Sequence, residues 1–349
     1  MTVISQLPGN ESQFAAGCEL LRQPGTLPGV QATRVEVIGE VCRPYSRLRK
    51  IRITTPQRRL QAYMKQYLLK EPGEAHAAMM RERVAKDYQV TSTVCARFEA
   101  ACPGLHVQRP LACFPDLRIV VFEESPGDNF QAFIRRHAYG WPARCRLTQL
   151  LEYAERCGEW LRCLQQLFPG EAPFVPEEMW IYIDQRLQRL IAAPESPLDE
   201  TMREQIHGYF EHLTAQSKNP DLRTSATHAD FFPGNILVDP TGVTVLDLAM
   251  FTQSSVYHDV AQFYHQLELL RLKPIFRPGA IRQLQQAFLR GYDPDFDPWN
   301  PMFAAFQLQH VTTHLHRLYR LRDLPLHERW YNRRVSGYHY RWIEQTVTC

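Results

Sequence analysis

From about Val35 to Phe122, the pattern of apolar and polar residues is a mixture of strand-like and helical segments. Segments rich in β-branched and aromatic residues predict strands at Arg34–Val41, Lys50–Thr54, Leu60–Leu69, Val107–Cys113 and Leu117–Glu123. Ala75–Phe98 is rich in alanine, methionine, arginine and glutamate, which predicts one long helix or two short ones. We therefore expect a small β-rich lobe with the order β-β-β-α-β-β.

The pattern changes after the turn-forming segment Ser125–Asp128, where apolar residues take up helical spacing. Helices are predicted at Asn129–Arg136, Leu147–Phe168, Glu177–Ala192, Leu198–Ser217, Ser255–Arg271, Gly279–Tyr292 and Trp299–Arg322. Ala226–Phe251 interrupts them with short apolar runs and turn residues. The fold class is therefore α+β with two lobes. The expected parts are a loosely held arm at 1–30 with a short helix at Glu11–Leu21, a β-rich lobe at 31–124 and a helical lobe at 125–349.

Composition excludes several classes of protein. A length of 349 residues is typical of about two domains, and 44% hydrophobic with 22% charged residues is ordinary globular usage. The net charge of +3 argues against a dedicated nucleic-acid binder. No apolar run reaches the roughly 18 residues of a spanning helix, and the N-terminus lacks a signal-peptide pattern. We expect no membrane partner.

The 9 cysteines are scattered, odd in number and without a Cys-x-x-Cys pair. This distribution matches neither a disulfide framework nor a zinc finger. We therefore expect buried free thiols in a reducing compartment and a cytoplasmic location.

The most informative stretch is Thr227–Val238, which contains the pattern His-x-Asp-x-x-x-x-Asn from His228 through Asp230 to Asn235. Asp247 follows in a second apolar run, after an Asp-Pro-Thr-Gly turn that predicts a β-hairpin. The first Asp and the Asn lie on the loop that enters the hairpin, and Asp247 lies near its exit. We therefore expect the three side chains to converge.

Converging Asp, Asn and Asp side chains suit phosphoryl transfer. One Asp accepts or orients the attacking hydroxyl, while an Asn and a second Asp supply hard oxygen ligands to Mg²⁺. A chain of this composition would contain the His-Asp-Asn pattern by chance roughly 0.01 times. The alternative is a hairpin in which Asp and Asn only form turns.

These residues resemble the catalytic and metal-binding loops of the aminoglycoside phosphotransferase and choline kinase superfamily, which has a protein-kinase-like fold. The run Pro233–Asp239 is close to the family form, although Ala229 replaces the usual glycine. The resemblance implies that Asp230 is the catalytic base and that Asn235 and Asp247 bind Mg²⁺.

It also implies that His228 and Asp259 support the catalytic loop rather than react. The Asp259 position matches a second Asp-x-Ala element of the family, in His-Asp-Val-Ala at 258–261.

Further upstream, the resemblance implies a phosphate-binding lysine on the strand that ends near Leu69. Lys65 is the first choice and Lys70 the other. An acid on the following helix should hold this lysine, and spacing leaves Glu82 and Asp87 equally open. Backbone groups near Phe122, Glu123 and Glu124 would then contact the adenine of ATP.

Two differences from protein kinases narrow the range of activities that the resemblance implies. No Gly-rich loop is present between Val35 and Thr54, and only 11 residues separate Asp247 from Asp259, too few for a protein kinase's activation segment. We therefore expect an ATP-dependent kinase, with GTP the second choice, that phosphorylates a hydroxyl of a small molecule. Aminoglycoside, choline, sugar and glycan acceptors stay open, as does the oligomeric state.

Two other functions compete with this one. A catalytically inactive relative would bind only nucleotide or a partner, and a metal-dependent hydrolase would use His228 and Asp230.

Further signals favour structural roles. His310 and His314 have the i, i+4 spacing of a metal pair, but a packed helix explains them as well. The arginine- and aromatic-rich segment 317–341 is typical of a packed helix, with an RNA-facing or anion-binding surface as its alternative.

Overall fold

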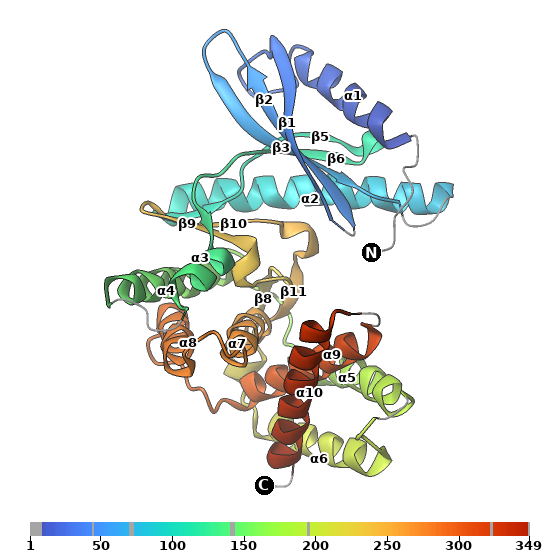
Figure 1. The fold of residues 1–349 in the computed structure, drawn as a ribbon, viewed down its shortest axis with the longest axis vertical. Helices are drawn as coiled ribbons and strands as arrows, with labels where there is room; N and C mark the ends of the chain where they lie inside the picture. Colours follow the sequence, from blue (N-terminus) through green and yellow to red (C-terminus); the bar gives the residue numbers. More distant parts are fainter. Residues whose placement is uncertain are drawn as a thin grey trace. The chain divides into compact units, whose positions relative to one another are not determined.

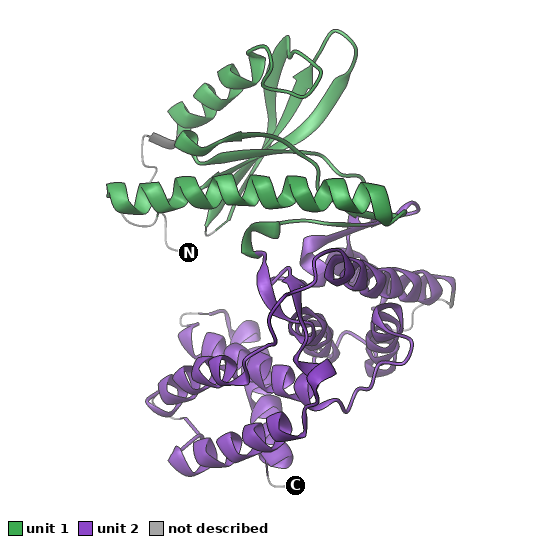
Figure 2. Cartoon of the chain, turned by 180° about the vertical axis from the view of Figure 1, so that it is seen from behind, with its two compact units in different colours: residues 1–127, 244–250 green, residues 128–243, 251–349 purple. Residues whose placement is uncertain are grey.

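The computed structural model describes residues 9–43, 45–69, 73–139, 144–193, 196–321 and 324–347. The chain forms two compact units (Figure 2). Unit 1 comprises Met1–Gly127 and Thr244–Met250, and unit 2 comprises Asp128–Val243 and Phe251–Cys349. A short segment from the second half of the sequence therefore belongs to the N-terminal unit.

Unit 1 is built on a five-stranded antiparallel sheet with the strand order β1-β2-β3-β6-β5 (Figure 1). Its strands are β1 (Arg34–Cys42), β2 (Ser46–Thr54), β3 (Arg59–Tyr67), β5 (Pro110–Phe114) and β6 (Ile119–Glu123). A hydrogen bond from Arg43 N to Ser46 O closes the connection between β1 and β2.

Both faces of this sheet are covered, and strand β6 shows why its apolar run is continuous. Ile119 and Val121 pack into one cluster, whereas Val120 and Phe122 pack into a second cluster on the opposite face. Successive side chains of a strand point to opposite faces, so a strand buried on both sides needs apolar residues at every position.

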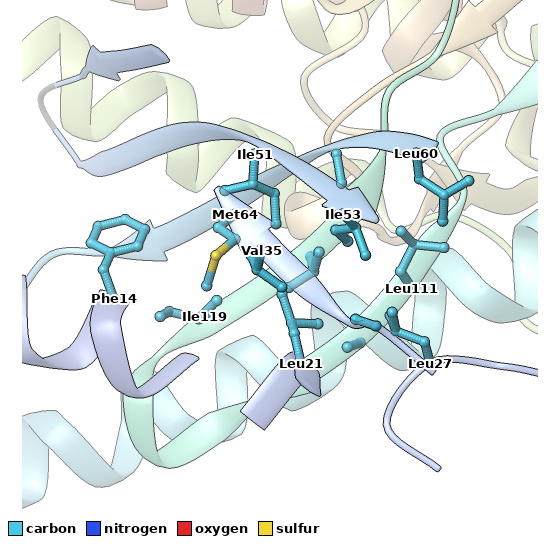
Figure 3. Close-up of a cluster of buried hydrophobic side chains, with 14 residues drawn as sticks. Phe14, Leu21, Leu27, Val35, Ile51, Ile53, Leu60, Met64, Leu111 and Ile119 are labelled. Carbon is cyan, nitrogen blue, oxygen red and sulfur yellow. The ribbon is translucent and has the colours of Figure 1, made fainter. Parts of the chain in front are cut away.

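Helix α1 (Gly9–Arg22) covers the first of these faces. Its Phe14 and Leu21 are buried with Ile51, Ile53 and Met64 of the sheet (Figure 3). The segment expected to be a loosely held arm thus contributes to the core of unit 1. The long helix α2 (Glu74–Ala101) supplies Met80 and Val84 to the second cluster.

The predicted strand Val107–Cys113 is two strands in the structure. Strand β4 (Leu105–Val107) lies beside β10 (Gly242–Val245), and β5 (Pro110–Phe114) pairs with β6. The 3₁₀ helix η1 (Pro115–Leu117) and Arg118, with φ of 56°, form the turn into β6. Strand β6 therefore starts two residues later than the sequence predicted.

Unit 2 is mostly helical, and its helices occur where the spacing of apolar residues predicted them. Their bounds are α3 (Phe130–His137), α4 (Arg144–Leu167), α5 (Pro176–Ile191), α6 (Glu200–Gln216), α7 (Tyr257–Arg271), α8 (Pro278–Tyr292), α9 (Pro301–Arg320) and α10 (Leu326–Val347). Short strands interrupt them: β7 (Asp128–Asn129), β8 (Thr224–Thr227), β9 (Ile236–Asp239) and β11 (Thr252–Ser255). The pairs β7–β9 and β8–β11 are antiparallel.

The expectation of buried thiols is only partly met. Among the described cysteines that are free, Cys157 is buried, but Cys42 and Cys145 are exposed. None of the helices in the described ranges combines the length and apolar character needed to cross a membrane.

Helices α4 and α8 approach each other closely through glycine. A Cβ atom added at Gly291 would lie 1.9 Å from Glu155 O, and one added at Gly158 would lie 2.1 Å from Phe288 O. Both neighbours are backbone atoms, so a side chain at either position would force the helices apart.

We predict that Gly291→Ala lowers the free energy of unfolding by about 3 kcal/mol, because the helix pair must separate to admit a methyl group. Gly208→Ala is the matched control in α6, where among the described residues nothing lies within 4 Å of an added Cβ. It should raise stability by about 0.5–1 kcal/mol through the higher helix propensity of alanine. Urea denaturation measures both, and equal effects would contradict the close approach.

Candidate active site

Lys65, near the end of β3, is held by acidic groups of unit 1. Its Nζ atom lies 2.7 Å from Asp247 Oδ1 and 3.7 Å from Asp87 Oδ2. Only 8% of the residue is exposed. Burial by itself lowers the pKa of the ammonium group, but the nearby carboxylates, Asp247 foremost, raise the pKa overall. The side chain is therefore a fixed cation between two carboxylates.

Asp87, rather than Glu82, is the helical acid that faces this lysine. Its carboxylate is buried and accepts hydrogen bonds from Tyr67 Oη at 2.6 Å and Thr91 Oγ1 at 3.4 Å. Glu82 is exposed. Positions five residues apart are about 140° apart around a helix axis, so only one of the two acids can face the sheet. The alternative lysine, Lys70, lies outside the described residues.

Asp247 reaches Lys65 from a backbone conformation that non-glycine residues rarely adopt. Its φ is 65°, in the left-handed region. The segment is held on both sides: Val245 O accepts a hydrogen bond from Gln108 N, and Ala249 of the 3₁₀ helix η4 (Leu248–Met250) packs against the cluster that contains Val84. Such strained residues persist where surrounding structure enforces them, and they cluster at functional sites.

The segment Phe122–Glu124, expected to contact adenine, forms the end of β6 and the residue after it. The Glu123 and Glu124 amides donate hydrogen bonds to Arg109 O and Gln61 O, at 2.8 and 2.9 Å. The Glu124 carboxylate also accepts a hydrogen bond from Lys50 Nζ at 2.6 Å. Two of the expected backbone donors are therefore engaged within unit 1, so any contact with a base falls to other backbone groups of this segment.

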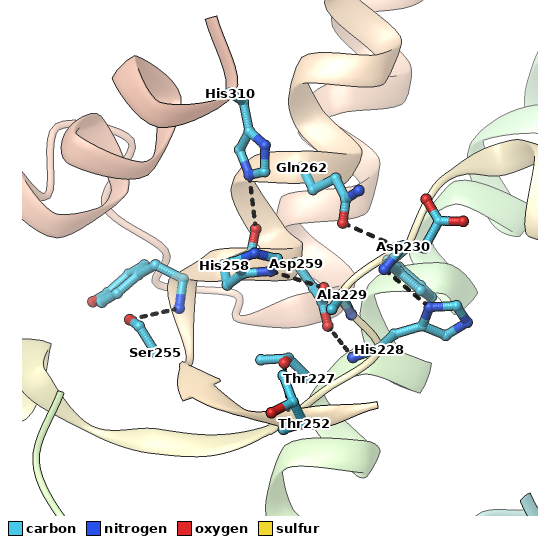
Figure 4. Close-up of polar contacts among 12 residues, drawn as sticks. Thr227, His228, Ala229, Asp230, Thr252, Ser255, His258, Asp259, Gln262 and His310 are labelled. Carbon is cyan, nitrogen blue, oxygen red and sulfur yellow. Dashed lines mark hydrogen bonds and ion pairs between the residues drawn. The ribbon is translucent and has the colours of Figure 1, made fainter. Parts of the chain in front are cut away.

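In unit 2, the buried carboxylate of Asp259 in α7 holds the loop after β8 by hydrogen bonds; we call this contact the Asp259 staple (Figure 4). Asp259 accepts hydrogen bonds from the backbone amides of His228 at 2.6 Å and Ala229 at 3.0 Å. Burial raises the pKa of this carboxyl, but hydrogen bonds from His258 and from the His228 amide lower it overall. The loop is thus anchored to a buried anion.

The staple holds Ala229 at a φ of 58°. For an alanine this left-handed conformation costs roughly 1 kcal/mol, which explains why glycine is the more usual residue at this place of the motif. The next amide, of Asp230, donates to His228 Nδ1 at 3.3 Å, and that of Phe231 donates to Gln262 Oε1 at 3.1 Å.

Asp230 and Asn235 face each other across this loop. Asn235 Nδ2 donates to Asp230 Oδ2 at 2.9 Å and to Asp230 O at 3.0 Å. In Figure 4 the Asp230 carboxylate points away from Asp259. Asn129, which caps α3, donates from its Nδ2 atom to Gly234 O at 2.7 Å and so supports the same loop.

An aromatic layer packs against the loop. The Phe231 ring stacks on Trp160 of α4 with centroids 5.5 Å apart and lies 5.3 Å from Phe263 of α7. His228 is fully buried and contacts Trp160 and Phe231 edge to face. His228 is therefore a packing residue in this structure.

The model of the phosphotransferase enzyme family, APH, matches residues 126–302, just over half of the chain. The chain belongs to this family. The match covers the loop with Asp230 and Asn235 and the Asp259 staple, and it also includes Asp247.

Solved structures show that this phosphotransferase also shares the fold of aminoglycoside phosphotransferases and choline kinases. The choline kinase from Cryptosporidium parvum Iowa II is 13% identical, with 96% of this chain and 97% of that chain covered and a TM-score of 0.56. Aminoglycoside phosphotransferase APH(4)-Ia is 11% identical, with 98% and 99% covered and a TM-score of 0.56. A thermostable mutant of APH(4)-Ia, in complex with ADP and hygromycin B, is 12% identical. The comparison covers 91% of this chain and 94% of that chain, with a TM-score of 0.51. No curated protein sequence matches significantly.

Sequence reasoning about this phosphotransferase missed three supporting residues: Tyr67, Asn129 and Gln262. Gln262 follows Asp259 by three positions, so one face of α7 carries both groups that hold the loop. Asn129 precedes an amphipathic segment, as helix-capping residues do. Tyr67 had no such signal, because its role depends on the distant Asp87.

We predict that Asp87→Ala lowers the free energy of unfolding by about 3 kcal/mol, since it leaves the buried Lys65 with one carboxylate fewer and Tyr67 Oη without its acceptor. Glu82→Ala, on the same helix, should change stability by no more than about 0.5 kcal/mol. Urea denaturation of the two variants makes the comparison. A larger loss in Glu82→Ala would contradict the assignment of the lysine's partner.

Proposed function

We propose that this phosphotransferase moves the γ-phosphoryl group of ATP to a hydroxyl group of a small molecule. The observation that carries the proposal is the Asp259-stapled loop, which fixes Asp230 and Asn235 together by hydrogen bonds of 2.9 and 3.0 Å. Membership in the family and the ADP held by the APH(4)-Ia relative support ATP as the donor.

In this proposal, Asp230 accepts the hydrogen bond of the acceptor hydroxyl and takes its proton as the oxygen attacks. The Asn235 amide, which donates to Asp230 Oδ2, holds the carboxylate in one orientation. Phosphoryl transfer asks mainly for such positioning and for neutralisation of charge.

Lys65 neutralises charge on the nucleotide phosphates. Asp87 and Tyr67 position it, because they surround the ammonium group in a buried site. Since Lys65 has a raised pKa, it stays protonated across the physiological pH range.

The donor atoms of Asp247 and Asn235 fit Mg²⁺, because carboxylate and amide oxygens are hard ligands. Asn235 uses its Nδ2 atom toward Asp230, so its amide oxygen is the atom that it offers to an ion. When bound, Mg²⁺ would supply positive charge that neutralises the nucleotide phosphates.

A small acceptor is favoured by the short path from Asp247 to Asp259. The described chain there forms only η4, strand β11 and the first turn of α7, and β11 pairs directly with β8. This segment has no room for the long substrate-binding activation loop of a protein kinase. Aminoglycoside, choline, sugar and glycan acceptors all remain candidates.

The competing function is an inactive relative that binds nucleotide or a partner. It is favoured by the strand β1, where Gly39 lies at an irregularity of the β1–β2 pairing and Glu40 is paired with Arg47 and Arg49. Gly39 is also the only glycine between Val35 and Thr54, so this part of unit 1 has no Gly-rich phosphate-binding sequence.

We predict that Asp247→Ala abolishes the Mg²⁺-dependent binding of ATP, because it removes a metal ligand. Calorimetry on the wild-type chain and the variant, each with ATP and Mg²⁺, measures this. Asp116→Ala, an exposed acid in η1, is the control and should bind like the wild type. A folded wild-type chain that binds no ATP would contradict the proposal.

We further predict that Asp230→Ala retains ATP binding but lowers phosphoryl transfer by about 10³-fold, because the hydroxyl loses its general base. ADP formation is followed with a panel of aminoglycoside, choline and sugar acceptors. Nucleotide binding without transfer to any acceptor would favour the inactive relative. Unchanged turnover in the variant would exclude Asp230 as the base.

A further inference from the structure

A cavity of about 620 Å³ lies within unit 2, away from the residues assigned to phosphoryl transfer. Helices α6 to α10 contribute to its wall. Its polar lining includes Tyr264, His265, Glu268, Tyr338 and His339. Two of these residues belong to a cluster of histidines that the proposed transfer reaction does not use.

The cluster consists of three histidines from three helices: His265 of α7 and His339 of α10, which line the cavity, and His314 of α9. Each offers one ring nitrogen, and these nitrogens all lie within 4.8 Å of one another. His265 and His339 are 3% and 0% exposed. The i, i+4 spacing had paired His314 with His310, but His310 Nε2 instead hydrogen-bonds to His258 O at 3.2 Å.

The cluster leaves buried nitrogens without partners. Among the described residues, neither His265 Nε2 nor His339 Nδ1 finds a hydrogen-bond partner. An unsatisfied buried polar atom costs about 1–3 kcal/mol, so two of them in one cluster need a reason. Packing alone would be served better by apolar side chains of similar size.

The ring positions approach those of metal ligands. Two nitrogens bound to one tetrahedral Zn²⁺ are about 3.3 Å apart, given zinc–nitrogen bonds of about 2.0–2.1 Å. His314 Nδ1 and His339 Nε2 are 3.1 Å apart and share a hydrogen bond, which a common ion would replace.

We propose that His265, His314 and His339 bind one divalent transition-metal ion, with Zn²⁺ as the best match. Three imidazoles without a thiolate or carboxylate suit zinc, and water from the adjoining cavity would fill the fourth position. The site is separate from the Mg²⁺ site of the transfer reaction, which uses oxygen ligands.

The ion would fasten the C-terminal helix to the rest of unit 2. The buried face of α10 consists of Val335, His339 and Ile343. A histidine at the centre of so narrow a face weakens its apolar packing. A bond from that histidine through a metal to α7 and α9 would replace the lost contact.

The test uses the full chain, freed of metal with a chelator and titrated with Zn²⁺ in excess Mg²⁺, which saturates oxygen-ligand sites. We expect one tightly bound Zn²⁺ per chain, retained through gel filtration, and a higher melting temperature. His314→Gln and His339→Gln should each weaken Zn²⁺ binding at least about 100-fold. His316→Gln, on the same helix as His314, should bind like the wild type.

A measurement on the wild-type chain alone guards against variants that do not fold. Co²⁺ in a four-coordinate histidine site gives much stronger visible absorption than the hydrated ion, and added Zn²⁺ should abolish it. Failure of the wild-type chain to bind Zn²⁺ or to give this spectrum would overturn the proposal and leave a hydrogen-bonded histidine cluster. Equal binding by His314→Gln and His316→Gln would overturn it too.

Discussion

The Asp259 carboxylate is the interaction on which the loop with Asp230 depends. A buried anion is stable only when it is fully hydrogen-bonded, and here the backbone amides of His228 and Ala229 satisfy it. In return, it holds Ala229 in a left-handed conformation that an alanine would leave if it were free. The direction of Asp230 follows from that bend, and the position of Asn235 follows from Asp230. Stability and chemistry are thus coupled through one carboxylate.

In unit 1, Lys65 is likewise a buried charge that neighbouring groups of opposite charge stabilise. Asp247 has a left-handed backbone conformation, is held by packing on α2 and faces a cation that burial alone would disfavour. Asp87 also stabilises that cation and is itself fixed by a hydrogen bond from Tyr67. In unit 2 the buried Asp259 carboxylate holds the strained Ala229, which directly precedes Asp230, whereas in unit 1 the strained residue, Asp247, is itself a group proposed to act. The energy stored in these conformations is supplied by the surrounding cores.

The histidine cluster of unit 2 consists of buried neutral rings rather than buried charges, and its ring nitrogens need hydrogen-bond partners. Neutral imidazoles resemble small aromatic rings, yet each has two nitrogens that seek partners. At the loop, His228 is satisfied within an aromatic layer and by the Asp230 amide. Near the cavity, His265 and His339 keep a nitrogen without a partner in the described chain, and both face His314. This difference separates a histidine that packs from histidines that can bind an ion.

The amino-acid sequence by itself determined the strands of the five-stranded sheet, most of the helices, the resemblance to the family and the residues of the hairpin motif. These features depend on neighbours close along the chain: β-branched and aromatic runs in strands, helical spacing, and the short pattern from His228 to Asn235. Only the tertiary structure decided that Asp87 and not Glu82 faces Lys65, that residues 105–114 form two strands, and that His314 meets His265 and His339. Those choices depend on contacts between distant segments, such as the 182 residues that separate Lys65 from Asp247. Local patterns state which face of an element is buried, whereas packing against the other elements decides which side chain each buried group meets.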